Sequence, residues 1–131
     1  EFQFSPAAIS QEIEAKAQKI AKDVISKLNM VGLLAVELFL TKSGELLVNE
    51  IAPRPHNSGH HTIECCFTSQ FAQHLRSILN LPLGNTGLIM PGAMLNVLGA
   101  AGYEGTAFYE GLEDILSLDG VYPHLYGKTN N

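Results

Sequence analysis

Residues 34–51, LAVELFLTKSGELLVNEI, decide the fold of this 131-residue chain. Apolar residues recur at every second position up to Leu40, a short glycine-containing segment follows, and a second apolar run extends from Leu46 to Ile51. Two such runs joined by a turn are typical of an antiparallel pair of strands. The pattern therefore predicts a β-hairpin over residues 33–51.

The segment before the hairpin has the period of a helix. Apolar residues recur every three or four positions from Ile13 to Leu28, after a serine, Ser10, that can cap the first turn. The opposite face carries charged side chains, which is typical of a surface in contact with solvent. A helix that runs into a β-hairpin predicts an α+β fold.

Directly after the hairpin, residues 48–61 read VNEIAPRPHNSGHH. Two prolines within three residues exclude a regular helix or a central strand, so the loop has a fixed and irregular backbone. Arg54, His56 and Asn57 are therefore displayed at the end of a strand. Rigid loops that carry polar groups are common positions for functional residues.

The rest of the chain predicts one more helix and a small β-rich part. Residues 62–80 have helical periodicity, with Thr68 or Ser69 as a candidate cap. After residue 82, short apolar pieces separated by glycine predict strands over 93–98 and 121–126 and a short helix over 111–116. We therefore expect two parts, residues 1–82 and residues 83–131.

Composition excludes several classes of function. The formal charge is -5 and only eight Lys and Arg are present, so no basic surface is available for nucleic acid. No apolar run approaches the roughly 20 residues that span a bilayer, so we expect no membrane insertion. The two cysteines, Cys65 and Cys66, are adjacent, which disfavours a disulfide and fits a reducing compartment. The chain begins without a methionine, which suggests a piece of a longer protein.

The hairpin brings two carboxylates together if its loop has an even number of residues. Glu37 then lies directly opposite Glu50, and like charges in that position destabilise a sheet unless a partner offsets them. Mg²⁺, or Mn²⁺ as an alternative, suits two carboxylates without cysteine. The competing interpretation is that one glutamate is exposed or pairs with Arg54. A loop of three or five residues would shift the register by one.

The proline loop also allows two interpretations. Arg54 offers a planar fork for an anion, His56 can donate or accept a proton, and Asn57 can orient a polar substrate. Alternatively, Arg54 pairs with a glutamate, and Asn57 and Ser58 only form turn hydrogen bonds. A zinc site is disfavoured because the prolines and Gly59 break the helix that would give the histidine spacing its meaning.

Five motifs resemble the ATP-grasp superfamily and, within it, the carboxyaminoimidazole ribonucleotide synthetase family. The run through residues 53–60 is the part most specific to this branch. The resemblance implies the C-terminal half of an ATP-grasp domain, with helix, antiparallel hairpin and helix, followed by a small β-rich subdomain. The motifs are AVELF at 35–39, GELLVNEIAPRPHNSGH at 44–60, TSQF at 68–71, MLNVLG at 94–99 and HLYGK at 124–128.

The resemblance implies a reaction in which ATP activates bicarbonate as carboxyphosphate and the amine of aminoimidazole ribonucleotide is carboxylated. It implies Glu37 and Glu50 as magnesium ligands and Asn49 with Glu50 as the ATP-contacting segment. It also implies a cytoplasmic enzyme of purine biosynthesis, a homodimer at full length and a mutase that acts on the product. By the same resemblance, the catalytic residues are Arg54, His56 and Asn57, and the substrate-binding residues are these three with Ser58 and Lys128.

The sequence also departs from the family pattern. The nucleotide-like N-terminal domain and the first half of the ATP-grasp domain are absent, and His61 stands where an aromatic residue is frequent. We therefore expect these 131 residues alone to be inactive. Two alternatives stay open: another ATP-grasp carbon–nitrogen ligase or transformylase, and a non-catalytic structural module.

Overall fold

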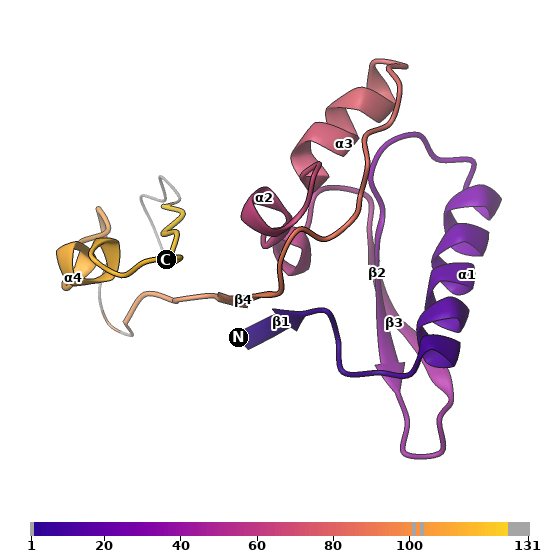
Figure 1. Ribbon diagram of the computed structural model, residues 1–131, viewed down its shortest axis with the longest axis horizontal. Helices are drawn as coiled ribbons and strands as arrows, with labels where there is room; N and C mark the ends of the chain where they lie inside the picture. The colour runs from indigo at the N-terminus through magenta and orange to yellow at the C-terminus, as the bar shows by residue number, and fades with distance from the viewer. Residues whose placement is uncertain (1, 101, 103, 126–131) are drawn as a thin grey trace. The chain divides into compact units, whose positions relative to one another are not determined.

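The computed structural model describes residues 2–100, 102 and 104–125 (Figure 1). Two compact units divide the chain, Glu1–Leu95 and Asn96–Asn131. This division reflects compactness alone, and the domain boundary expected after residue 82 stays a prediction. The first unit contains the candidate site residues of the hairpin and of the proline loop, and Lys128 is outside the described residues.

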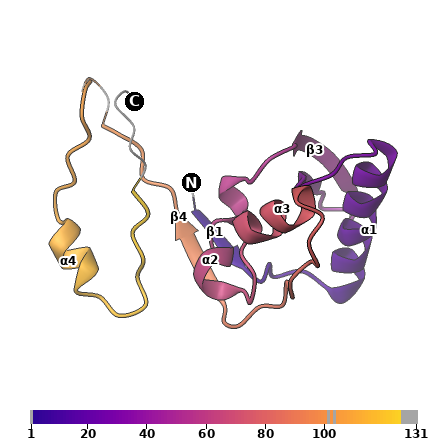
Figure 2. The ribbon, with the colours of Figure 1, turned by 90° about the horizontal axis from the view of Figure 1, so that it is seen from above.

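The first unit is built around a helix and a hairpin. Helix α1 (Gln11–Lys27) runs beside strands β2 (Ala35–Leu40) and β3 (Leu46–Ala52), which pair antiparallel (Figures 1 and 2). Ser10 caps α1 by accepting a hydrogen bond from the Ile13 N–H at 3.3 Å, as the sequence predicts. The predicted α+β class, with a helix followed by an antiparallel hairpin, is confirmed.

The hairpin register differs from the expected one near the turn. The Thr41 N–H donates to the Glu45 carbonyl at 2.9 Å, which leaves a three-residue loop, residues 42–44, with Gly44 at φ 84°. This odd loop pairs Leu38 with Val48, one residue out of the predicted register. A β-bulge between Glu37 and Leu38 then adds Asn49 on β3 and brings Glu37 opposite Glu50. The predicted carboxylate pair is therefore confirmed, although the even loop was wrong.

A second ribbon joins the start of the unit to its end. Strand β1 (Phe2–Ser5) pairs antiparallel with β4 (Gly92–Leu95), and Figure 2 shows the two side by side. The sequence predicts a strand over 93–98, of which β4 forms the first part, but it gave no sign of β1. Such a pairing depends on contacts more than 85 residues apart, which periodicity cannot reveal.

The single helix expected over 62–80 is two helices, α2 (Thr62–Cys65) and α3 (Gln70–Ile78). The break occurs because the chain between them pairs with a later segment: the Phe67 N–H donates to the Gly87 carbonyl at 3.1 Å, and Cys66 forms a β-bridge with Leu88. Ser69, one of the two predicted caps, accepts from the Ala72 N–H and starts α3.

Helix α3 also anchors the segment between α1 and β2. The His74 ring accepts a hydrogen bond from the Leu33 N–H at 3.0 Å, and the Ser77 hydroxyl accepts from the Gly32 N–H at 3.1 Å. Gly32 has φ 119°, and an added Cβ would lie 3.1 Å from the His74 ring. A bare glycine is therefore required where α3 approaches the backbone.

The second unit has little regular structure in its described residues. Helix α4 (Leu112–Leu116) follows Gly111 at φ 77°, in agreement with the predicted helix over 111–116. The strand expected over 121–126 is not formed across residues 121–125, and residue 126 lies outside the described part. None of the helices in the described ranges is long and apolar enough to cross a membrane.

Candidate functional site

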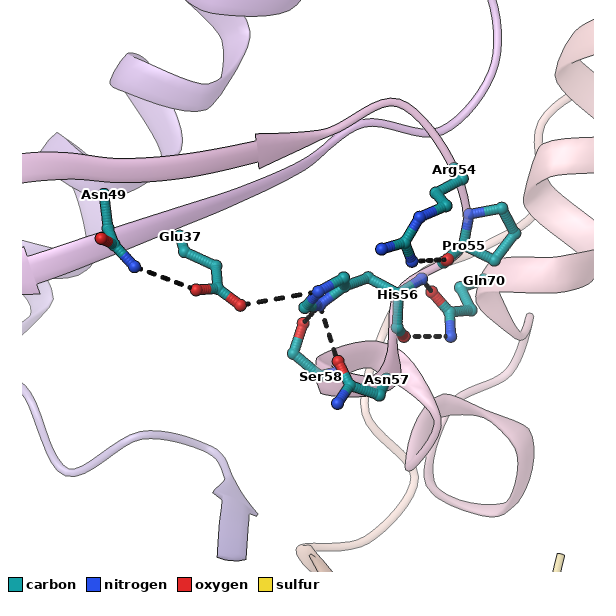
Figure 3. Close-up of polar contacts among 8 residues, drawn as sticks. All are labelled: Glu37, Asn49, Arg54, Pro55, His56, Asn57, Ser58 and Gln70. Atoms are coloured by element: carbon teal, nitrogen blue, oxygen red, sulfur yellow. Dashed lines mark hydrogen bonds and ion pairs between the residues drawn. The ribbon is translucent and has the colours of Figure 1, made fainter. Parts of the chain in front are cut away.

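The hairpin end of the site contains Glu37, Asn49 and Glu50. The bulge explains their grouping, because strand side chains alternate between faces and an extra residue changes that alternation. The Asn49 amide donates to Glu37 Oε2 at 3.2 Å, and Figure 3 shows Glu37 between Asn49 and His56. The Glu37 side chain is 36% exposed, and Glu50 is exposed. Solvent and a dissolved cation can therefore reach this end.

His56 connects the hairpin to the loop. Its ring Nε2 lies 3.6 Å from Glu37 Oε1, and its Nδ1 lies 2.9 Å from the Ser58 hydroxyl oxygen. The backbone N–H of Ser58 donates to the same Nδ1 at 3.4 Å, so Nδ1 is an acceptor. A neutral His56 therefore carries its proton on Nε2, facing the carboxylate.

The loop backbone is fixed by Gln70, the first residue of α3. The Gln70 side chain accepts from the His56 N–H at 2.9 Å and donates to the His56 carbonyl at 2.7 Å (Figure 3). The 3-10 helix η1 (Asn57–Gly59) follows, with the His56 side chain as its cap. Gln70 lies within the TSQF motif at 68–71, but the sequence predicts no role for it.

The side chains of Arg54 and Asn57 both form hydrogen bonds with nearby backbone groups. The exposed Arg54 guanidinium donates to the carbonyl of Pro55 at 3.1 Å, and Glu37 contacts Asn49 and His56 instead. The alternative in which Arg54 pairs with Glu37 is therefore wrong. Asn57 Oδ1 accepts from the Ser58 N–H at 3.1 Å, which is the turn hydrogen bond foreseen in the competing interpretation.

A hollow of about 520 Å³ opens beside Glu37, Asn49 and Ser58. Its walls come from the hairpin, from the β1–β4 ribbon and from the start of the loop helices, so it combines carboxylate, amide and hydroxyl groups with apolar surface. The polar residues that line it are Gln3, Ser5, Glu37, Asn49, Ser58 and His61, and Phe4 and Met94 are among the apolar ones.

The donor set suits magnesium better than zinc. Across residues 2–100, 102 and 104–125, no group of three His, Cys, Asp or Glu side chains is placed to hold a metal ion. The hairpin instead offers two carboxylates and an amide oxygen. Mg²⁺ is commonly held by one or two carboxylates, with water and phosphate oxygens completing its shell, so these residues fit that ion. Burial raises the pKa of the Cys66 thiol, which disfavours the thiolate that a metal ion would need.

Comparison with known proteins defines the class. Residues 1–71 match the ATP-grasp domain model. The chain belongs to the ATP-grasp family. Residues 92–131 match the model of the phosphoribosylaminoimidazole carboxylase C-terminal domain, which identifies the branch that this chain resembles.

Relatives and solved structures agree with that branch. The N5-carboxyaminoimidazole ribonucleotide synthase of Bacillus subtilis is 57% identical over 94 residues, covering 72% of this chain and 25% of the relative. The crystal structure of N5-carboxyaminoimidazole ribonucleotide synthetase from Thermotoga maritima matches with a TM-score of 0.92 and 52% identity, over 98% of this chain and 36% of that one.

A third matching structure contains bound molecules. It is N5-carboxyaminoimidazole synthase from Aspergillus clavatus in complex with ADP and 5-aminoimidazole ribonucleotide, with a TM-score of 0.74, 40% identity, and coverage of 77% of this chain and 28% of that one. Thus the chain spans between about a quarter and about a third of the length of these three proteins.

Proposed function

We propose that this chain is the C-terminal portion of an ATP-dependent carbon–nitrogen ligase of purine biosynthesis. In the reaction, ATP phosphorylates bicarbonate to carboxyphosphate, and the amine of aminoimidazole ribonucleotide then takes the carboxyl group. The observation that carries this proposal is the 57% identity to a synthase named for that product, together with the hairpin carboxylates beside the His56 loop.

We assign the hairpin end to ATP and its cation. Glu37 and Glu50 would hold Mg²⁺, or Mn²⁺, and Asn49 would orient Glu37 through the hydrogen bond at 3.2 Å while lying beside the nucleotide. When bound, the cation neutralises phosphate charge during phosphoryl transfer. Binding of ATP follows from membership of the ATP-grasp family, whose Aspergillus clavatus relative is described with ADP.

We assign the loop end of the site, which comprises residues 54–58, to bicarbonate and the ribonucleotide. Arg54 is exposed and its guanidinium bonds only a neutral carbonyl among the contacts described, so it can turn toward an anion. His56 and Asn57 would orient the reacting groups, and Ser58 lines the hollow beside them. Lys128 is proposed as a point charge for the ribonucleotide phosphate on the sequence resemblance alone.

The wider setting is also part of the proposal. We infer a cytoplasmic homodimer at full length, whose carboxylated product is consumed by a mutase. The adjacent thiols Cys65 and Cys66 support a reducing compartment, since both are free. The product carries a carboxyl group on nitrogen, so a later step that moves it to carbon requires an isomerising enzyme.

The test is phosphate release by the full-length protein. We expect release from ATP to require both aminoimidazole ribonucleotide and bicarbonate, and to stop when Mg²⁺ is chelated. Release that requires formate in place of bicarbonate would instead identify a transformylase. No ATP-dependent turnover with any of these substrates, in a protein that is folded, would indicate a structural module and refute the proposal.

A further inference from the structure

We propose that Gln70 is a positioning residue for the loop end of the site, acting through the backbone of His56. This inference rests on the proposed function, because it concerns how the ribonucleotide and bicarbonate are placed. Gln70 does not face the hollow beside Glu37, and it is 7% exposed. Its effect on the reaction therefore has to pass through His56.

The contact resembles the pairing of two strands. The Gln70 amide satisfies both backbone groups of His56 at 2.9 and 2.7 Å, and His56 has the extended conformation φ -125°, ψ 150°. Both residues are buried, at 7% and 9% exposure, where a hydrogen bond left unmade is costly. The bonds therefore hold one backbone conformation at the residue whose ring lies between Glu37 and Ser58.

The surroundings hold Gln70 itself in place. Its backbone N–H donates to the Thr62 hydroxyl at 2.9 Å, and that hydroxyl donates to the Gly59 carbonyl at 2.5 Å. A Cβ added to Gly59 would lie 2.6 Å from Gln70 Oε1, so no larger residue fits there without moving the amide. Gly59 and Thr62 thus fix Gln70 from the loop side.

The Gln70 contact affects the orientation of the His56 ring more than the stability of the fold. The His56 ring contacts the hairpin at Glu37 and caps η1 through its contact with Ser58. A shift of its backbone would move the ring relative to both. Small displacements of positioned groups can cost about 100-fold in rate, so a loss of the Gln70 contact should reach the chemistry.

Helix α3 provides a matched control in Gln73. Its side chain makes the same paired contact with another backbone, accepting from the Gly84 N–H at 2.7 Å and donating to the Gly84 carbonyl at 3.0 Å. Gln73→Met and Gln70→Met therefore lose the same kinds of hydrogen bond from the same helix. Only Gln70→Met releases His56.

The experiment is steady-state kinetics on the full-length enzyme. We expect Gln70→Met to lower kcat/KM for aminoimidazole ribonucleotide about 10- to 100-fold, the range seen when a supporting residue is lost. The KM for ATP should change less than about threefold, because the hairpin end keeps its own contacts. Gln73→Met should lower the melting temperature by a similar amount and leave both constants unchanged.

A second pair of variants keeps the test independent of folding losses. Gly59→Ala should lower kcat/KM for the ribonucleotide because its methyl group displaces the Gln70 amide. When Gly59→Ala is added to Gln70→Ala, kcat/KM should fall no further, because the Gln70 amide that the new methyl group would displace is already absent. The proposal is overturned if the two losses add, or if Gln70→Met and Gln73→Met change the kinetics equally. Failure of the wild-type enzyme to turn over would refute the proposed function instead.

Discussion

The carboxylates of the hairpin are accessible to solvent, whereas His56 in the adjoining loop is 9% exposed and is hydrogen bonded at both backbone groups. Glu37 keeps 36% of its side chain exposed and Glu50 is exposed. The loop end is therefore preorganised by the described chain itself. The hairpin end places two like charges opposite each other, and we propose that a bound cation offsets their repulsion.

This comparison predicts the largest loss at the hairpin end. Glu50→Gln in the full-length enzyme should reduce turnover more than about 100-fold, because removing a ligand exceeds the 10- to 100-fold cost of a supporting residue. The rate of phosphate release measures this turnover. Glu45→Gln, an exposed carboxylate near the hairpin turn, is the control and should leave turnover intact. Normal turnover in Glu50→Gln would remove Glu50 from the cation site.

Arg54 tests the loop end next. Arg54→Ala should lower turnover by about 10- to 100-fold, since a hydrogen bond to a charged group contributes about 1.5–3 kcal/mol. ATP binding, measured by calorimetry, should stay unchanged because, among the described contacts, Arg54 bonds the Pro55 carbonyl and neither hairpin carboxylate. Loss of ATP binding in this variant would show that Arg54 serves the nucleotide and that the two ends are not distinct.

Asn49 has a smaller expected effect at the bulge. Asn49→Ala removes one hydrogen bond to Glu37, worth about 1 kcal/mol, so the affinity for Mg²⁺ with ATP should fall about fivefold. Asn85→Ala, which loses the hydrogen bond that its side-chain oxygen accepts from the Gly87 N–H away from the site, is the control. If both variants bind Mg²⁺ and ATP like the wild type, then Asn49 does not orient Glu37.

Ser58 should show the smallest effect. Ser58→Ala loses the hydroxyl contact with His56 Nδ1, but the Ser58 backbone N–H still donates to that nitrogen. We expect less than about a threefold change in kcat/KM for the ribonucleotide, since a redundant hydrogen bond contributes little. A loss comparable with that in Arg54→Ala would mean that the Ser58 hydroxyl contacts substrate directly.

Local patterns predicted the local elements well. The cap at Ser10 and the cap at Ser69 follow from short-range hydrogen bonding, which the sequence encodes directly. The pairing of Glu37 with Glu50 was predicted for a different reason from the one observed. A three-residue loop and a bulge at Asn49 produced the same pair, because two shifts of one residue cancel.

Long-range contacts explain the structural features that the sequence did not predict. The strand β1 and the break between α2 and α3 both depend on partners distant in sequence, and periodicity carries no information about such partners. Gln70 was also missed as a functional residue. A glutamine at the start of a helix is ordinary in sequence, and its role is apparent only from the two bonds to His56.

The most direct test of the account is whether Glu37 and Glu50 bind one cation together. Mn²⁺ binding to the full-length protein in the presence of ATP can be followed by electron paramagnetic resonance. We predict that Glu37→Gln and Glu50→Gln each weaken Mn²⁺ binding by more than about 10-fold, and that Glu45→Gln binds like the wild type. Wild-type affinity in either site variant would contradict a shared cation site at the bulged end of the hairpin.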